Sequence, residues 1–542
     1  MASFRVRIRI GWLGALAAVL LGAVAGAQAQ AAQDAAMSQE AASEGRGRIV
    51  LALPFDNRSG QPSLDWIREA AAEVLSRSFR AAGFAPMSRT DRLYALDHLG
   101  LPAGFQPSRA SELKLAQTID ADAVVVGSFR TQGSQIIAEA RVVNVPRLEM
   151  SAPVTAQGEM SELVPVFSAL AWKLTKALDP AYSVPEESFV AVGRGVRVDA
   201  FEQYIRGITE PDHDERIKHL KQSVALSATF SPAWMALGRE DYSAGQYDEA
   251  ASAFAKVARS DADALEAGFY RGLSLMFSGQ YKDAEAAFAE VARVLPLGEV
   301  LNNQAVAIAR QGRDASAQFI AAETADPNAA DYHFNLAVSL KRRGDANGAL
   351  AELQQTLKLR PNDTEAQSLV KQWADSTADK SADKVDPLER IVRTFDAVAF
   401  RQAAVMMDQM EADRLQTLKP RERAEKLATQ ADGFLDRGLL LEAEREYLAA
   451  VMADGSVAAG HAGLAEVRER TGDTAAARSE AKKALDIQPS ARAYVVLGRL
   501  DMGENHLDAA VKDASSAVAL EPSNKAAQEL SRQIALRTGK SQ

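Results

Sequence analysis

Small residues recur along this chain at a fixed spacing, and this recurrence constrains the fold more than any other feature. Six residues are each followed 34 positions later by the same residue type (238 to 272, for example): Gly238, Gly245, Tyr247, Ala250, Phe254 and Val257 by Gly272, Gly279, Tyr281, Ala284, Phe288 and Val291. Five less complete copies follow: Ala305, Gly312, Ala317; Ala337, Gly344, Ala349, Leu353, Pro361; Ala431, Gly438, Ala443, Tyr447, Ala450; Ala465, Gly472, Ala477, Ala481, Ala484, Pro489; and Gly498, Asn505, Ala510, Ala514, Ala517, Pro522. A period of this length predicts pairs of helices that stack on one another.

The residue types at the repeated positions explain how such a pair would pack. Gly or Ala at the eighth position lets the second helix approach the first, and Gly at the turn permits a short connection. Asn505 stands at the last turn, where asparagine tolerates the left-handed conformation. We expect the alanine at the twentieth position of all seven copies to pack against the first helix, and proline to stop the second.

This pattern resembles the tetratricopeptide repeat (TPR), which implies a superhelical solenoid. The chain is therefore predicted to be multidomain, with an N-terminal α/β (α+β) domain followed by an all-α TPR solenoid. We expect one array over 199–374, a hinge over 375–386 and a second array over 387–537. Within these arrays the predicted units are clear repeats 231–264, 265–297, 298–329, 330–363, 424–457, 458–490 and 491–523, weaker copies near 201–224 and 388–418, and a capping helix over 524–537.

The concave face of a TPR array is lined by the first helix of each pair, and the resemblance implies a protein or peptide partner there. Helical geometry assigns positions two, five, six, nine, twelve and thirteen to this face. The candidate groove residues combine aromatic, amide and basic side chains: Phe269, Tyr270, Leu273, Met276, Phe277, Asn303, Arg310, Asn335, Lys341 and Arg342. An asparagine in a groove can pair with backbone amides of an extended peptide. The alternative is that the aromatic residues pack against a neighbouring helix or the α/β domain.

The second position of the first four clear repeats makes one class of ligand unfavourable. TPR relatives that clamp an acidic C-terminus use Lys, Asn and Arg at the second and sixth positions. Two asparagines match this pattern, but the second positions carry Pro232, Glu266, Glu299 and Asp331. Acidic residues at these positions would repel a terminal carboxylate.

Residues 48–180 alternate between strand and helix patterns and predict the α/β domain, with 181–198 as a linker. Two motifs stand out, Leu53–Ser59 (LPFDNRS) and Ala121–Ser128 (ADAVVVGS). On these motifs the domain resembles the N-terminal domain of the Tol translocation protein and its relatives in curli secretion and flagellar outer-membrane assembly. The resemblance implies an envelope-located interaction domain without a reaction attached.

The N-terminus is typical of an export signal. Arg5, Arg7 and Arg9 precede an uncharged apolar run, and Ala27-Gln28-Ala29 supplies a small-residue cleavage site. We therefore expect a signal peptide over 1–29, a disordered tether over 30–47 and an exported protein, periplasmic or envelope-associated, with no membrane span after cleavage. The alternative is an uncleaved anchor.

The remaining composition argues against catalysis. The chain has no cysteine, which excludes disulfides, thiolate metal sites and a lipid-modified cysteine. The net charge of -10 disfavours nucleic-acid binding. The six histidines, expected on helix surfaces, show no metal-ligand spacing: His98, His213, His219, His333, His461 and His506.

We therefore expect a scaffold or adaptor with no enzyme activity, no metal and no cofactor; its oligomeric state is not indicated. Two alternatives stay open: an outer-membrane secretion or assembly component, and an enzyme with a site at Asp56, Asn57 and Arg58.

Overall fold

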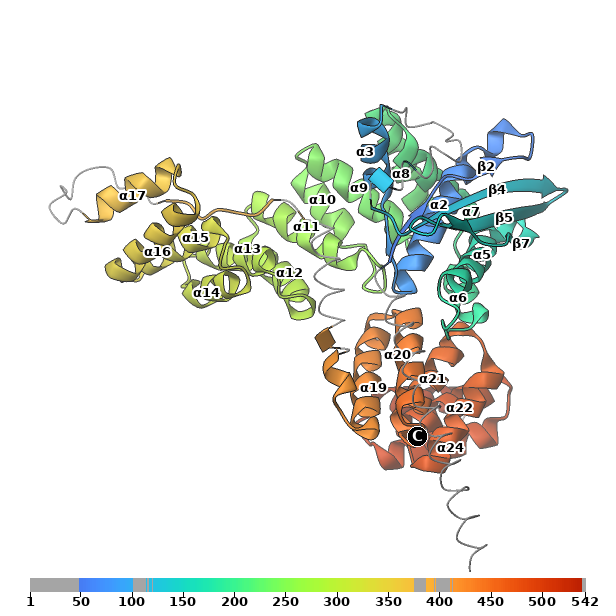
Figure 1. Cartoon of the computed structure of the whole chain (residues 1–542). Coiled ribbons are helices and arrows are strands. Elements are labelled where there is room, and N and C mark those ends of the chain that lie inside the picture. The colour runs from blue at the N-terminus through green and yellow to red at the C-terminus, as the bar shows by residue number, and fades with distance from the viewer. Residues whose placement is uncertain are drawn as a thin grey trace, which may run out of the picture.

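The computed structural model describes residues 48–100, 114, 117–118, 120–374, 387–393, 395, 410–411 and 413–538 (Figure 1). The predicted signal peptide, tether and hinge lie outside these ranges. Among the described helices, none combines the length and apolarity that a bilayer crossing requires.

The N-terminal domain is a mixed sheet with helices on both faces. Strands β3, β1 and β4 pair in parallel, and β4, β5 and β7 pair antiparallel, with Leu51 opposite Val124 and Ala138 opposite Ala156. Its strands are β1 (Ile49–Ala52), β2 (Asp56–Asn57), β3 (Ala85–Pro86), β4 (Ala123–Gln132), β5 (Gln135–Asn144), β6 (Glu149–Met150) and β7 (Val154–Glu159). Helices α2 (Trp66–Ala81) and α5 (Leu163–Leu178) cover one face, and α3 (Arg89–His98) packs on the other.

The two sequence motifs of this domain meet in its core. Phe55 is fully buried and lies edge-on to Phe167 of α5, with ring centroids 5.7 Å apart. A Cβ added at Gly127 would lie 2.4 Å from the Phe55 ring. Gly127 therefore leaves the space on β4 that the Phe55 ring occupies.

The predicted linker over 181–198 is not a plain connection. It contains helix α6 (Glu186–Gly193), which packs on α5. The Trp172 indole donates to the Val184 carbonyl at 2.8 Å, and Phe189 is buried. Proline and glycine suggested a linker, but Phe189 and Val184 complete the domain core.

The first array consists of antiparallel helix pairs that extend away from the α/β domain (Figure 1). Its helices are α7 (Val198–Thr209), α8 (His213–Leu226), α9 (Ser231–Ser243), α10 (Tyr247–Phe254), α11 (Ala264–Phe277), α12 (Tyr281–Val294), α13 (Gly298–Ala309), α14 (Ser316–Ala325), α15 (Ala330–Arg342), α16 (Ala346–Leu359) and α17 (Thr364–Ala374).

The second array comprises α19 (Pro420–Arg437), α20 (Leu440–Ala453), α21 (Ala458–Thr471), α22 (Thr474–Ile487), α23 (Ala491–Gly503), α24 (Leu507–Leu520) and α25 (Lys525–Thr538).

The repeated glycines act as the sequence predicts. A Cβ at Gly238 or Gly272 would lie within 3 Å of the Phe254 or Phe288 ring, so glycine admits the aromatic side chain of the second helix. The turn residues are left-handed, with φ of 75° at Gly245 and 64° at Asn505. The small residues therefore lie between paired helices.

The third repeat departs from the predicted packing. Ala317, at the twentieth position, is exposed, while Ala315, Phe319 and Ala322 are fully buried. Phe319 lies seven residues after Gly312, whereas Phe288 lies nine after Gly279 (319 − 312 and 288 − 279). Two fewer residues therefore separate the turn glycine from the buried face of the second helix, and that face is carried by different residues.

Both arrays contact the α/β domain. Arg77 and Arg80 of α2 form ion pairs with Asp263 of the first array at 3.4 and 2.5 Å. Although burial alone would raise it, Arg80, Arg77 and Arg239 hold the pKa of Asp263 well below its usual range. In the second array Arg445 donates to the Ala81 carbonyl at 3.5 Å, and α6 packs against α20 and α21.

The chain must therefore return from the far end of the first array to reach the second. Residues 387–393 form no helix, contrary to the predicted start of the second array at 387 and to a weak repeat over 388–418. Residues 396–409 of that predicted repeat lie outside the described ranges. We call residues 387–393 and 395 the return segment.

Candidate functional site: the groove of the first array

The return segment occupies the inner wall of the first array. It runs from α17 past α15 and α13 toward α11, against the order of the repeats (Figure 1). The wall that we expected to face a partner therefore contacts the chain itself.

Asparagines hold the backbone of this segment. Asn335 on α15 accepts from the Arg390 amide at 2.7 Å and donates to its carbonyl at 2.8 Å. Asn303 on α13 does the same for Val392, at 2.9 and 2.8 Å. Asn302 also donates to the Arg390 carbonyl, at 3.1 Å. All three asparagines are fully buried, and they satisfy alternate residues of an extended chain as a neighbouring β-strand would.

Two arginines hold Glu389. Its carboxylate pairs with Arg310 at 3.0 Å and with Arg342, and its side chain is only 1% exposed. The same arginines donate to the carbonyls of Glu389 and Pro387, at 3.2 and 3.1 Å. A carboxylate so thoroughly desolvated needs this paired charge.

Arg390 fills a pocket for a guanidinium group. It donates to both oxygens of Asp363 (2.6 and 3.0 Å), to Asp331 (2.9 Å) and to Glu365 (2.9 Å). Its guanidinium carbon lies 3.6 Å from the ring centroid of Phe334, in a cation–π contact. Hydrogen bonds from Arg390 hold the pKa of Asp363 below its usual value.

The aromatic predicted residues lie at the other end of the segment. The Phe395 ring contacts Phe269 and Tyr270, with centroids 5.5 and 6.4 Å apart. The Arg393 guanidinium lies 5.3 Å from the Phe277 ring. Phe269 and Tyr270 also pack within the array, as the alternative interpretation anticipated.

Three predicted groove residues have other surroundings. Leu273 and Met276 are buried in the core between α11 and its neighbours. Lys341 lies over the ring of Trp373 on α17, 5.3 Å from its centroid. These positions face the helix layer more than the groove.

Sequence reasoning left several functional residues out of the candidate set. Asn302, Asp331 and Phe334 stand at groove positions two and five but outside the candidate set. Asp363 and Glu365 lie after Pro361, beyond the first-helix positions used to define the groove. The acidic second position, taken only as a reason to exclude carboxylate ligands, was the available signal for a cationic ligand.

Two histidines are buried rather than on the surface, and they occupy equivalent positions. His333 Nδ1 lies 2.7 Å from Glu352, and His461 Nδ1 lies 2.6 Å from Glu480, each 19 residues downstream. The Nε2 atoms lie 3.0 and 3.2 Å from the carbonyls of Pro327 and Gly455. Each ring thus ties the two helices of a repeat to the preceding loop.

Two groups of acidic residues with a histidine lie close together among the described residues. Glu323, His333 and Glu352 group closely, but both ring nitrogens of His333 have the partners given above. Asp501 and Glu504, beside His506, share Arg478 at 2.7 and 2.9 Å. Neither arrangement supports a metal site.

The alternative enzyme site comprises strand β2 and the first residue of the turn that follows it. Asp56 and Arg58 pair at 3.8 Å with most of their side chains in solvent. The Asn57 amide closes the loop by donating to the Gln61 carbonyl and to Asp65. These contacts support a structural role for the turn.

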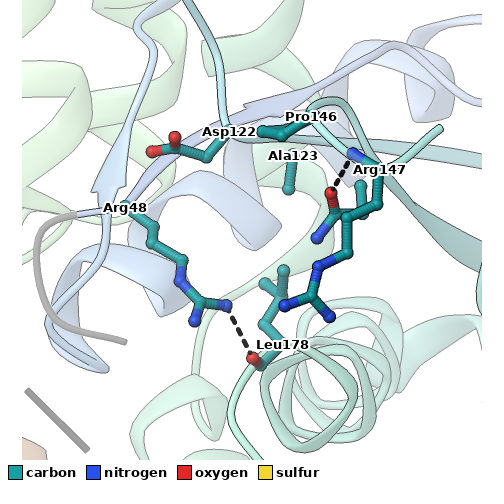
Figure 2. Close-up of a pocket in the computed structure, with 7 residues that line it drawn as sticks. Arg48, Asp122, Ala123, Pro146, Arg147 and Leu178 are labelled. Carbon is teal, nitrogen blue, oxygen red and sulfur yellow. Dashed lines mark hydrogen bonds between the residues drawn. The ribbon is translucent and has the colours of Figure 1, made fainter. Parts of the chain in front are cut away.

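A cavity of about 270 Å³ lies elsewhere in this domain, between the strand ends and α5 (Figure 2). Arg48 points across it and donates to the Leu178 carbonyl, and the Arg147 amide donates to Asn144. Asp122 accepts from the Ile49 amide at 2.7 Å and so orders the sheet edge. The seven lining residues include no pair of nucleophile and base.

Comparison with known proteins gives likenesses for the helical repeats. No family model matches the chain, and no curated protein is significantly similar to it. Among solved structures, YrrB, "a TPR protein with an unusual peptide-binding site", is 20% identical, with 32% of this chain and 90% of YrrB covered and a TM-score of 0.29. MamA from AMB-1 is 20% identical (30% and 99% covered, TM-score 0.27), and MamA from Desulfovibrio magneticus RS-1 is 18% identical (34% and 100% covered, TM-score 0.27). These structures are TPR proteins; their low identities and TM-scores carry no argument about function.

Proposed function

We propose that the protein is an exported scaffold that holds other proteins in the cell envelope, and that the groove of the first array is its binding surface. The observation that carries this proposal is the pair Asn303 and Asn335, each bonded to both the N–H and the C=O of one residue of an extended chain. Such bonds recognise backbone, which every polypeptide offers, so a segment of another protein can accept them equally well.

The groove has the composition of a protein-binding surface. Its aromatic end at Phe269, Tyr270 and Phe277 adjoins buried amides and then paired arginines at Arg310 and Arg342. Aromatic anchors beside satisfied polar groups supply most of the energy in protein interfaces. The α/β domain, fixed to both arrays, would set the direction in which the groove points.

Photo-crosslinking in living cells tests the function. A photoreactive residue replaces Phe277, at the rim of the groove, or Val511, an exposed residue on α24 that serves as control. We expect a covalent adduct with another protein from position 277 only, and we expect Asn303→Leu with Asn335→Leu to abolish it. Equal adducts from both positions, or an adduct that survives both asparagine changes, would refute the groove as the binding surface.

The exported location is proposed from residues 1–29 and from the resemblance of residues 48–180 to envelope proteins. Fractionation of a two-membrane cell, with N-terminal sequencing, should find a periplasmic chain that begins after Ala29. A chain that keeps residues 1–29 in the membrane fraction would indicate an anchor. Sedimentation of the processed chain with the outer membrane would favour the alternative role in secretion or assembly.

A further inference from the structure

The pockets around the return segment distinguish side chains as well as backbone. Arg390 has a bidentate partner in Asp363, two further carboxylates and an aromatic face. A lysine could supply the positive charge but not the two parallel hydrogen bonds that a planar guanidinium donates to a carboxylate. The pocket is therefore selective for arginine. Asp331 and Glu365 would also repel an acidic side chain at this place.

The arginine pocket is organised by the array itself. Asp363 caps α17 by accepting from the Ala366 amide at 3.0 Å, and Asp331 is held by Arg360 at 2.8 and 3.2 Å. Phe334 is fully buried on α15. Groups fixed in advance lose little entropy when a ligand arrives, which favours binding.

Next to it lies a second pocket of opposite charge. Arg310 and Arg342 come from the ends of α13 and α15 and enclose the Glu389 carboxylate. The two pockets lie side by side and accept consecutive residues, an acid and then an arginine. Five residues beyond the arginine, Phe395 contacts Phe269 and Tyr270.

We propose that the first groove is a receptor for a partner segment that carries Glu-Arg followed, five positions after the arginine, by an aromatic residue. The return segment is an internal stand-in for that partner, which must displace it. This inference rests on the proposed function and names the chemistry of the polypeptide that is held.

Because the return segment occupies the groove, it would compete with any partner and lower that partner's apparent affinity. Twelve residues (375–386) join α17 to Pro387, and a tether of this length gives an effective concentration of about 1 mM. Against a peptide whose intrinsic Kd is about 10 µM, this lowers the apparent affinity about 100-fold. Release of the return segment should therefore raise affinity by about 10- to 100-fold.

Fluorescence anisotropy tests the inference with a labelled peptide that has the sequence of residues 387–395. The receptors are the full chain and two full-length variants that weaken the internal contacts, Glu389→Ala with Arg390→Ala, and Val392→Pro, which removes the amide bonded to Asn303. We expect both variants to bind the peptide at least about 10-fold more tightly than the unaltered chain does. Two independent variants keep the test valid if one misfolds.

Specificity is tested by changing each side of the arginine contact. In the peptide, the arginine that corresponds to Arg390 is changed. Its replacement by lysine should weaken binding, and its replacement by alanine should weaken binding about 10-fold or more. In the receptor, Asp363→Asn keeps a capping side chain and removes the charge, so it should weaken the arginine peptide but not the alanine peptide. Equal binding of the native and a scrambled peptide would overturn the inference.

Two further outcomes separate this inference from the function on which it rests. A dimer that grows with protein concentration and excludes the peptide would overturn the inference, because a second copy would then be the occupant. An envelope adduct at position 277 that is lost in the asparagine variants but unchanged by Asp363→Asn would leave the scaffold function standing and remove the Glu-Arg specificity. Loss of both would refute both.

Discussion

The two arrays share one repeat but use their inner faces differently. At the sixth repeat position the first array has Asn303 and Asn335, which hold a polypeptide backbone. The same position in the second array has Gly463 and Val496, both buried among its own helices.

Charge is also placed differently in the second array. There Arg492 of α23 reaches Asp432 of α19 at 2.6 Å and Glu466 of α21 at 2.9 Å, so first helices are tied to one another. In the first array Arg310 and the carboxylates of Asp331 and Asp363 hold the return segment instead. The repeated residues thus decide the helix packing. The positions between them decide whether the first helices bind a polypeptide segment or form ion pairs with one another.

The largest effect is expected when the first array's asparagine is placed in the second. A Cβ at Gly463 would lie 2.1 Å from the Tyr447 ring, so Gly463→Asn should destabilise the second array by about 3 kcal/mol. Hydrogen exchange of α19–α22 measures the loss. The control, Gly433→Ala on α19, has open space around it and should be neutral or stabilise by about 0.5–1 kcal/mol. If hydrogen-exchange protection of α19–α22 were unchanged in Gly463→Asn, the inner face of the second array could accept an asparagine at this position, as the first array does.

Removal of the buried acid of the return segment should have an effect of similar size, on the first array. Glu389→Ala leaves Arg310 and Arg342 without their carboxylate, so the free energy that holds the segment should fall by about 3 kcal/mol. Faster hydrogen exchange at the Arg390 and Val392 amides reports this, while the second array keeps its protection. Leu388→Ala, at the exposed neighbouring residue, is the matched control and should change neither.

A smaller effect is expected when Arg492, which links the first helices of the second array, is replaced. Arg492→Met removes partly exposed ion pairs and should cost about 1 kcal/mol of second-array stability. The return segment should exchange as before. Arg532→Met, which breaks an exposed pair within α25, should leave the stability nearly unchanged. Equal losses in the two variants would contradict a bracing role for Arg492.

The smallest expected effect is a difference between the two arrays in how their stability depends on pH. Burial alone would lower the pKa of His333, but hydrogen bonds to Pro327 and Glu352 raise it above its ordinary value. Its contribution is therefore complete below about pH 6.5 and is lost as the pH rises through the raised value.

In the second array the sign is opposite. Burial alone would raise the pKa of Glu480, but hydrogen bonds from His461 and Lys483 lower it to about 2. This contribution is complete above the ordinary pKa of glutamate and is lost only as the pH falls toward 2. Unfolding followed between pH 5 and 8 should show a decline in the first array that His333→Gln removes. A decline of equal size in that variant would assign it to other groups.

Much of this architecture follows from the sequence because it depends on local spacing. The 34-residue recurrence predicts the helix pairs, and glycine at residues such as 238 and 272 is where an aromatic ring must fit. Asn303 and Asn335 were expected to pair with the backbone of an extended peptide, and they do pair with one, that of their own chain. That they also bind a partner remains our prediction.

Other features depend on distances that spacing does not encode. Ala317 obeys the repeat in sequence but not in packing, because the buried face of its helix begins two residues closer to the turn glycine than in the second repeat. His333 and His461 are buried because loop carbonyls and helix carboxylates converge on them. The sequence shows the residue types but not this convergence.

The sequence by itself therefore determined the repeat, the helices and the chemistry of the groove wall, since these arise from contacts at fixed offsets along the chain. Only the tertiary structure decided what lies in the groove. The second array docks against the α/β domain near Ala81, and the return segment runs back along the first array. Glu389 and Arg390 thereby meet pockets built by residues 25 to 79 positions away, whose complementarity is not visible in the sequence.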